Sequence, residues 1–207
     1  MKTSLEEKIM WLELSLLFFN LLIRILFSYH FYQKWVALKM QLTLYWLLTF
    51  MGFTLASLIV IIQYIIHYNL EEAIDSTLMV SLISLGFLSL SVGKLSFIPV
   101  KKRIYSGIIG LLLLSSILMN LLTGSEDLIR LSLLLFTLII FGGYVFLSLK
   151  ARDFALLLVS LGLIIIGLSG ILSSKGVLNI IGAIMVRALG QIVIALGLIK
   201  GKISNQD

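Results

Sequence analysis

Five polar residues inside long apolar segments are where this chain could do chemistry. The first such segment carries Glu13, Asn20 and Arg24, whose spacings of seven and four residues place them on one helical face. The last segment carries Arg187 and Gln191. A charged side chain at the centre of a membrane helix costs about 2.5–3.5 kcal/mol on insertion scales, so such residues face protein, water or a ligand. We therefore predict a ligand-binding or partner-binding polar cluster made of Glu13, Asn20, Arg24, Arg187 and Gln191.

Arg187 is the most informative of these residues because of its depth. It lies about ten residues, or about 15 Å at the helical rise, from either end of its segment, which is too deep for its side chain to reach the headgroups easily. It shares a helical face with Ala183, Gly190 and Gly197, and small residues mark the packed face of a membrane helix. If the first and last helices touch, as in a closed seven-helix ring, Asn20 lies level with Arg187 and Arg24 lies level with Gln191.

The predicted cluster has an excess of positive charge. Glu13 is the only carboxylate clearly inside an apolar segment, and it lies near the outer end. An anionic small molecule, a lipid headgroup or a carboxylate of another subunit would complement the two guanidinium groups. Two structural alternatives stay open. Arg187 bonds only to backbone carbonyls and buried amides, or Arg24 and Glu13 extend along their helix to the headgroups.

Catalytic and metal-binding sets are not apparent in the sequence. Ser169 lies in a Gly-Leu-Ser-Gly stretch, but no histidine follows His67 to serve as its base. His30 and His67 are expected at opposite ends of the membrane, where they cannot share a metal ion or a haem. The chain has no cysteine, which removes thiolate ligands and cysteine nucleophiles. We predict a non-enzymatic protein without metal or cofactor.

The composition indicates that these polar residues sit in a membrane. Of 207 residues, 60% are hydrophobic and 13% are charged. Apolar runs of about 20 residues recur along the chain, each long enough to cross a hydrocarbon core about 30 Å thick. The formal net charge of +6 comes from residues between the apolar runs, so it is read as a topology signal and not as a nucleic-acid-binding surface.

We expect one all-α transmembrane domain over residues 1–207. Its seven predicted spans are 10–29, 43–66, 77–95, 104–122, 128–149, 154–172 and 177–199. Basic residues follow the first, third, fifth and seventh spans, and acidic residues follow the second and fourth. By the positive-inside rule, the N-terminus is outside, the C-terminus is inside, and the protein is a multi-pass protein of the cell membrane. Lys2, Lys8 and Lys175 are exceptions on the outer side.

Aromatic residues fit the same frame. Trp and Tyr favour the interface because their rings are apolar while the N–H and O–H groups reach water. We expect Trp11 and Tyr68 at the outer interface, and at or near the inner one Trp35, Tyr45, Trp46, Tyr105 and Tyr144.

A weak internal similarity suggests a 3+1+3 arrangement. Leu14-Ser15-Leu16-Leu17 matches Leu131-Ser132-Leu133-Leu134, and Leu85-Gly86 with Gly93 matches Leu189-Gly190 with Gly197. These matches indicate two parallel three-helix units joined by the fourth helix. The alternative is that such matches arise by chance in Leu-, Ile- and Ser-rich segments.

Two functional classes remain from the sequence. The first is a module that acts through partners, as a receptor-like sensor or an accessory subunit, in contact with the lipid bilayer and with another membrane protein or a second copy. The second is a small transporter or facilitator with an anion-preferring site in the bundle. No nucleic-acid partner is expected.

Overall fold

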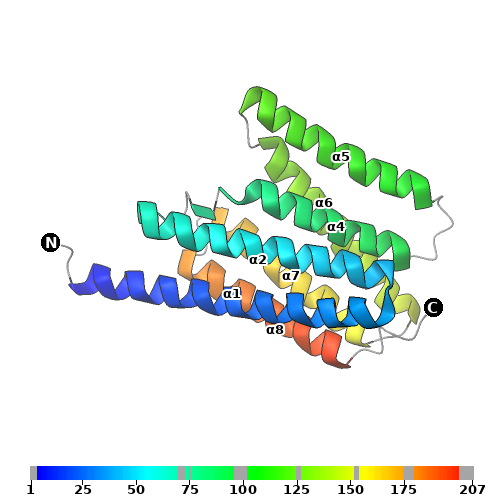
Figure 1. Ribbon diagram of the computed structural model, residues 1–207, viewed down its shortest axis with the longest axis horizontal. Helices are drawn as coiled ribbons and strands as arrows, with labels where there is room; N and C mark the ends of the chain where they lie inside the picture. The colour runs from blue at the N-terminus through cyan, green and yellow to red at the C-terminus, as the bar shows by residue number, and fades with distance from the viewer. Residues whose placement is uncertain are drawn as a thin grey trace.

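The computed structural model describes residues 4–69, 73–74, 76–95, 102–124, 127–151, 154–174 and 180–200. Over these residues the seven helices are α1 (Ser4–Leu38), α2 (Gln41–His67), α4 (Leu78–Leu95), α5 (Lys102–Thr123), α6 (Asp127–Ala151), α7 (Phe154–Ser174) and α8 (Ile180–Lys200). The predicted all-α class is confirmed for this part of the chain. Successive helices run in opposite directions (Figure 1), so α1 begins at one end of the molecule and α8 ends at the other.

Six of the seven predicted spans coincide with a helix to within a few residues. The exception is the first, because α1 continues past Tyr29 to Leu38. Hydropathy predicts only the apolar part of a helix, which can lie in the hydrocarbon core. The helix itself, defined by its backbone hydrogen bonds, continues until a residue with non-helical backbone angles ends it. Here Lys39 takes a left-handed conformation, with φ of 54°, and its N–H donates to the Trp35 carbonyl at 2.8 Å. This is a common way to end a helix.

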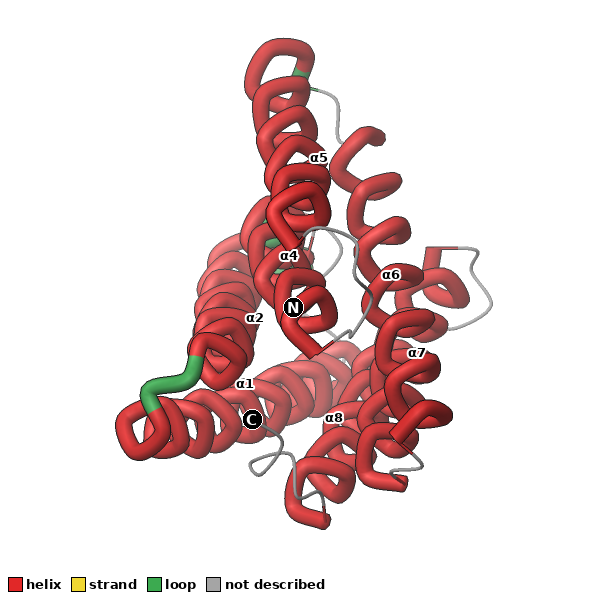
Figure 2. The backbone as a smooth tube through the Cα atoms, turned by 90° about the vertical axis from the view of Figure 1, so that its right-hand side faces the viewer, coloured by secondary structure: helices red, strands yellow, loops and turns green. Residues whose placement is uncertain are grey.

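Six of the helices form a ring. Around it, α1, α2, α4, α6, α7 and α8 each pack against the next, and α8 contacts α1 to close it. The end-on view in Figure 2 shows α5 outside this ring, against α4 and α6. The contact between the first and last helices, on which the predicted cluster depends, is present between α1 and α8, but the ring among the described helices has six members and not seven. The helices on either side of α5 in the chain contact each other directly, which leaves no place for α5 between them.

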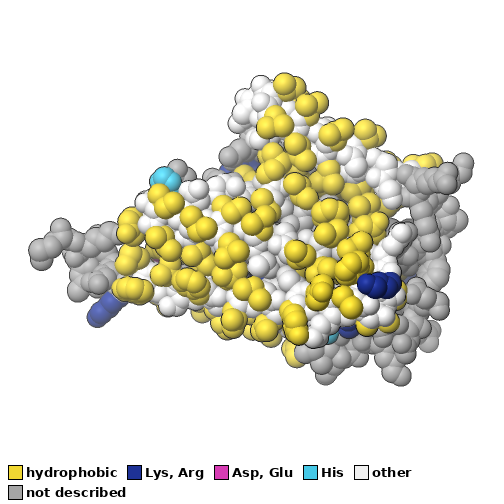
Figure 3. All heavy atoms as spheres, in the orientation of Figure 1, with side chains coloured by type: hydrophobic (Ala, Val, Ile, Leu, Met, Phe, Trp, Pro, Cys, Tyr) yellow, Lys and Arg dark blue, Asp and Glu magenta, His cyan; other side chains and the backbone are white. Residues whose placement is uncertain are grey.

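The surface of the described part is apolar. Figure 3 shows hydrophobic side chains spread over the whole described face, and on α5 the side chains of Leu111, Leu121 and Leu122 are among the most exposed. Within the described residues, four segments are long and apolar enough to cross a membrane: Lys8–Leu38, Gln41–His67, Ile104–Thr123 and Leu128–Lys150. The apolar stretches of α4, α7 and α8 are shorter. These features mark the chain as a membrane protein.

Many of the charged loop residues that predict the orientation lie outside the described residues. They fall at positions 70–72, 75, 96–101, 125–126, 152–153 and 175–179.

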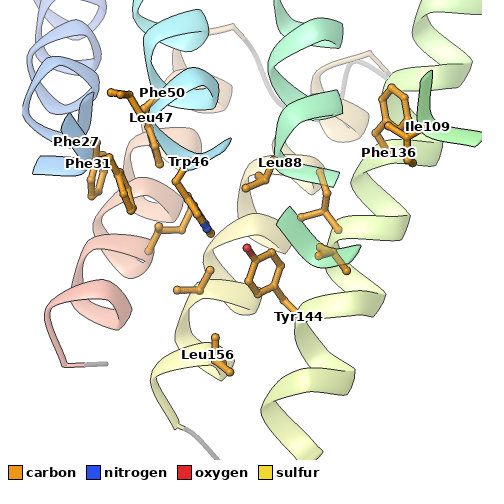
Figure 4. Close-up of a cluster of buried hydrophobic side chains, with 14 of the residues drawn as sticks. Phe27, Phe31, Trp46, Leu47, Phe50, Leu88, Ile109, Phe136, Tyr144 and Leu156 are labelled. Carbon is orange, nitrogen blue, oxygen red and sulfur yellow. The ribbon is translucent and has the colours of Figure 1, made fainter. Parts of the chain in front are cut away.

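Aromatic side chains fill the core between α1, α2 and α6. Phe31 stacks on Trp46 and Phe50, with ring centroids 5.3 and 5.5 Å apart, and Tyr144 meets Trp46 edge-on at 5.7 Å (Figure 4). Trp46 and Tyr144 are only 3% and 1% exposed, so both rings are packed inside the bundle. Tyr144 can be buried because its hydroxyl shares a hydrogen bond of 2.9 Å with Ser91 of α4.

Glycines bring α7 and α8 into close contact. A Cβ at Gly162 would lie 2.5 Å from the Gly190 carbonyl oxygen, and a Cβ at Gly190 would lie 2.8 Å from the Gly162 carbonyl oxygen. Further along, a Cβ at Gly197 would lie 2.8 Å from the Ala155 carbonyl oxygen. Only glycine allows the two backbones to approach this closely. The resulting antiparallel register places Ser169 beside Arg187.

We predict that Gly162→Ala or Gly190→Ala destabilises the protein by about 1–3 kcal/mol, because the added methyl forces the α7 and α8 backbones apart. Gly142→Ala in α6 is the matched control, since nothing lies within 4 Å of a Cβ built there. The midpoint of thermal unfolding of the purified protein is the measurement. Equal midpoints for the α7–α8 variants and the control would contradict the close packing.

Candidate functional site

Arg24 reaches from α1 to α2. Its Nη1 donates to the Phe53 carbonyl oxygen at 3.0 Å and to Ser57 Oγ at 2.5 Å. The guanidinium carbon also lies 5.6 Å from the centroid of the Phe53 ring, within the range of a cation–π contact. Arg24 is therefore directed across to the neighbouring helix and not along α1 towards the headgroups.

Arg187 makes the corresponding contact from α8 to α7. Its Nε donates to Ser169 Oγ at 3.1 Å, and the buried Ser169 hydroxyl donates in turn to the Ile166 carbonyl oxygen at 2.6 Å. Ser169 thus serves as a partner for the arginine, whereas from the sequence it stood out only as a possible nucleophile. The glycine spacing on α7 and α8 is the signal that could have found this pairing, because the glycines set the register.

The structure brings the two arginines into one region. The helices α1 and α8 pack against each other and run in the same direction. Each arginine thus lies on a helix that contacts the helix carrying the other. Among the described residues, the hydrogen-bond partners of both are neutral: a carbonyl and a hydroxyl for Arg24, and a hydroxyl for Arg187.

Asn20 and Gln191 lie one helical turn from these arginines and are 6% and 4% exposed. Asn20 Nδ2 donates to the Leu16 carbonyl oxygen at 3.0 Å, but Asn20 Oδ1 has no hydrogen-bond partner among the described residues. The same holds for Gln191 Oε1 and for Arg24 Nε. Buried polar atoms are rarely left without a partner, so each of these three needs an explanation.

Glu13 lies apart from this group. The Tyr64 hydroxyl of α2 donates to Glu13 Oε2, beside a small apolar cluster that includes Leu17 and Val60. Glu13 is eleven residues from Arg24, which is roughly 16 Å along α1. Of the acidic residues whose side chains the structure describes, it is the only one inside a helix. The structure therefore keeps the one described carboxylate away from the two guanidinium groups.

The four remaining members of the predicted cluster form the candidate anion site: Asn20, Arg24, Arg187 and Gln191. The site is formed by residues of α1 and α8, which contact each other. Arg24 is hydrogen-bonded to α2, and Arg187 is hydrogen-bonded to α7. Two buried cations with neutral partners cost several kcal/mol unless a counter-charge is present. Chemically, the arrangement is complementary to an oxyanion, which a guanidinium binds through charge-assisted hydrogen bonds.

Compared with protein-family models, curated proteins and solved structures, the chain matches none of them. The function is therefore inferred from the site itself.

We predict that the Glu13–Tyr64 pair and Arg24 are energetically separate. The effects of Glu13→Gln and Tyr64→Phe on the free energy of unfolding should be strongly non-additive. The reason is that both remove the same hydrogen bond, and a hydrogen bond to a charged group contributes about 1.5–3 kcal/mol. Glu13→Gln and Arg24→Gln should be additive to within about 0.5 kcal/mol, because the two side chains are far apart. Double-mutant cycles of thermal stability test this, with the exposed Tyr29→Phe as the control. A large coupling between Glu13 and Arg24 would show that Glu13 belongs to the site.

Proposed function

We propose that the protein is a seven-span integral membrane protein, N-terminus outside and C-terminus inside, that binds an anionic group at the candidate anion site. It acts without catalysis, as a receptor-like sensor or an accessory subunit that passes the bound state to a partner protein. The observation that carries this proposal is that Arg24 and Arg187 lie on two helices in contact, each with neutral partners only among the described residues, inside a bundle whose exterior is apolar. An anion supplies the charge that this region lacks.

Continuous helices favour a sensor over a transporter. Transporter sites are typically built from interrupted helices that change shape around the substrate. Here α1 and α2 run unbroken for 35 and 27 residues, and α7 and α8 for 21 residues each. Four uninterrupted helices are more consistent with ligand binding and small shifts between helices than with transport of a solute.

Lys34, Lys39 and Lys150 support the proposed orientation. All three lie at the end of the molecule where α1 and α6 finish, which is the side that the positive-inside rule assigns to the cytoplasm. Lys8 and Arg130 lie at the other end, so the charge bias is not complete. The same basic end, beside the apolar α5 outside the ring, offers a partner protein a surface to contact.

One observation favours the alternative of a small transporter or facilitator. The ring consists of α1, α2 and α4 followed by α6, α7 and α8, and the fourth helix, α5, stands outside. A 3+1+3 repeat is compatible with this arrangement. Against it, Gly86 faces Leu113 of α5 whereas Gly190 faces α7, so the matched glycines pack against different partners.

The absence of cysteine allows a direct test of topology. We predict that Thr123→Cys, at the end of α5, reacts with a membrane-impermeant maleimide in intact cells. Gln41→Cys, at the start of α2, should react only after permeabilisation, because it lies on the inner side. Both positions are exposed, so differences in labelling report the side of the membrane. The reverse pattern would reject the orientation, and labelling of both in intact cells would reject seven spans.

Anion binding is tested by stability. We predict that an anion raises the thermal midpoint of the purified protein and, at one hundred times its Kd, adds about 2.7 kcal/mol to the free energy of unfolding. Propanoate, phosphate and an anionic phospholipid are suitable probes. Arg187→Gln should abolish this rise, while Arg130→Gln, an exposed arginine of α6, should retain it. An equal rise in both variants would contradict the site.

Flux measurements separate the two functional classes. Liposomes that contain the protein should release a bound anion no faster than empty liposomes if the protein is a sensor. Arg187-dependent release would establish the facilitator instead.

A further inference from the structure

The three buried polar atoms without partners among the described residues differ in kind. Arg24 Nε is a hydrogen-bond donor, whereas Asn20 Oδ1 and Gln191 Oε1 are acceptors. From this mixture we infer that the occupant of the candidate anion site carries O–H or N–H donors close to its negatively charged oxygen. The occupant is thus a hydroxy- or amino-substituted oxyanion. This inference rests on the proposed function and specifies its ligand class.

A bare oxyanion would satisfy only half of the site. It can accept from Arg24 Nε and balance the charge of Arg187, but it has no hydrogen to offer to the two amide oxygens. These oxygens would stay buried without partners, at a cost of about tenfold or more in Kd. Water has the required hydrogens but brings no charge, so water alone would leave the two guanidinium groups without a counter-charge.

The orientation of the Asn20 amide is set by a second contact. Because Nδ2 donates to the Leu16 carbonyl oxygen at 3.0 Å, exchanging the amide nitrogen and oxygen would place two acceptors face to face. Oδ1 is therefore the atom left for the occupant, and it can only accept a hydrogen bond.

Helix spacing sets the size of the occupant. Asn20 precedes Arg24 by one turn on α1, and Gln191 follows Arg187 by one turn on α8. Each acceptor therefore lies one turn from a guanidinium group on its own helix. One turn is roughly 5–6 Å. The donors must therefore lie within a few bonds of the charged oxygen, as in a small 2-hydroxy or 2-amino acid or in the phosphoglycerol headgroup of a lipid.

The test compares ligands that differ by one group. Propanoate, 2-hydroxypropanoate and 2-aminopropanoate share a carbon skeleton, and their Kd values are measured by thermal stabilisation of the protein in nanodiscs of neutral phosphatidylcholine. We expect at least one of the two substituted acids to bind about tenfold more tightly than propanoate. In a lipid arm, nanodiscs with phosphatidylglycerol are compared with nanodiscs with phosphatidylmethanol, which has the same charge but no hydroxyl groups. The arm that shows the hydroxyl or amino preference identifies the source of the occupant.

Two variants locate the preference. Asn20→Leu and Gln191→Met remove an acceptor and keep a side chain of similar size, so each should reduce the preference while propanoate still binds. Asn120→Leu on α5 is the matched control and should retain the full preference. The series with the unmodified protein remains decisive even if a variant is unstable.

The outcomes separate the inference from the proposed function. If all members of both series bind equally well, and all lose binding in Arg187→Gln, the ligand class is wrong but the anion site stands. The ligand class is equally wrong if the preference persists in the combined Asn20→Leu, Gln191→Met variant. If neither series depends on Arg187, the proposed function itself is rejected.

Discussion

The constraint that governs this molecule is the lack of hydrogen-bonding partners in the hydrocarbon around it. Polar side chains within the helices mostly satisfy themselves locally, as when Thr49 donates to the Tyr45 carbonyl and Ser160 to the Leu156 carbonyl. Large apolar side chains such as Leu121 face outward. Against this background, the described side chains contain three buried polar atoms without partners, and all three belong to Asn20, Arg24 and Gln191. The unpartnered polar atoms among the described residues thus all belong to α1 and α8, which is why these residues are interpreted as a site.

Close backbone packing builds the walls of this site. The glycines of α7 and α8 fix an antiparallel register. This register, more than the attraction between the two side chains, places Ser169 beside Arg187. On the other side, Ser57 and the Phe53 carbonyl hold Arg24 against α2. The described hydrogen-bond partners of both arginines are thus neutral groups on a neighbouring helix, which do not compensate the charge.

The sequence predicted the helices well, because they follow from periodicity along one chain segment. It did not predict which helices are neighbours. Nothing in the hydropathy of residues 104–122 distinguishes a helix within the ring from one outside it, since lipid and protein interior are similarly apolar. For the same reason, Ser57 and Tyr64 of α2 were not foreseen as partners of Arg24 and Glu13. Trp46 was placed near the inner interface from its ring type alone, and its stacking on Phe31 inside the bundle was not foreseen.

The attachment of each arginine suggests how binding could be transmitted. Arg24 ties α1 to α2, and Arg187 ties α8 to α7, so the site lies between two helix pairs that each carry an arginine. The contact between α1 and α8 is also the least extensive of those that close the ring. In the proposed function, an anion bound between the pairs would supply a counter-charge to both arginines and so favour contact between the pairs. A ligand shifts such an equilibrium only by the difference in its affinity for the two arrangements. Here that difference arises where the ring is held least tightly, so the closure of the ring is the step through which occupancy would be communicated to a partner.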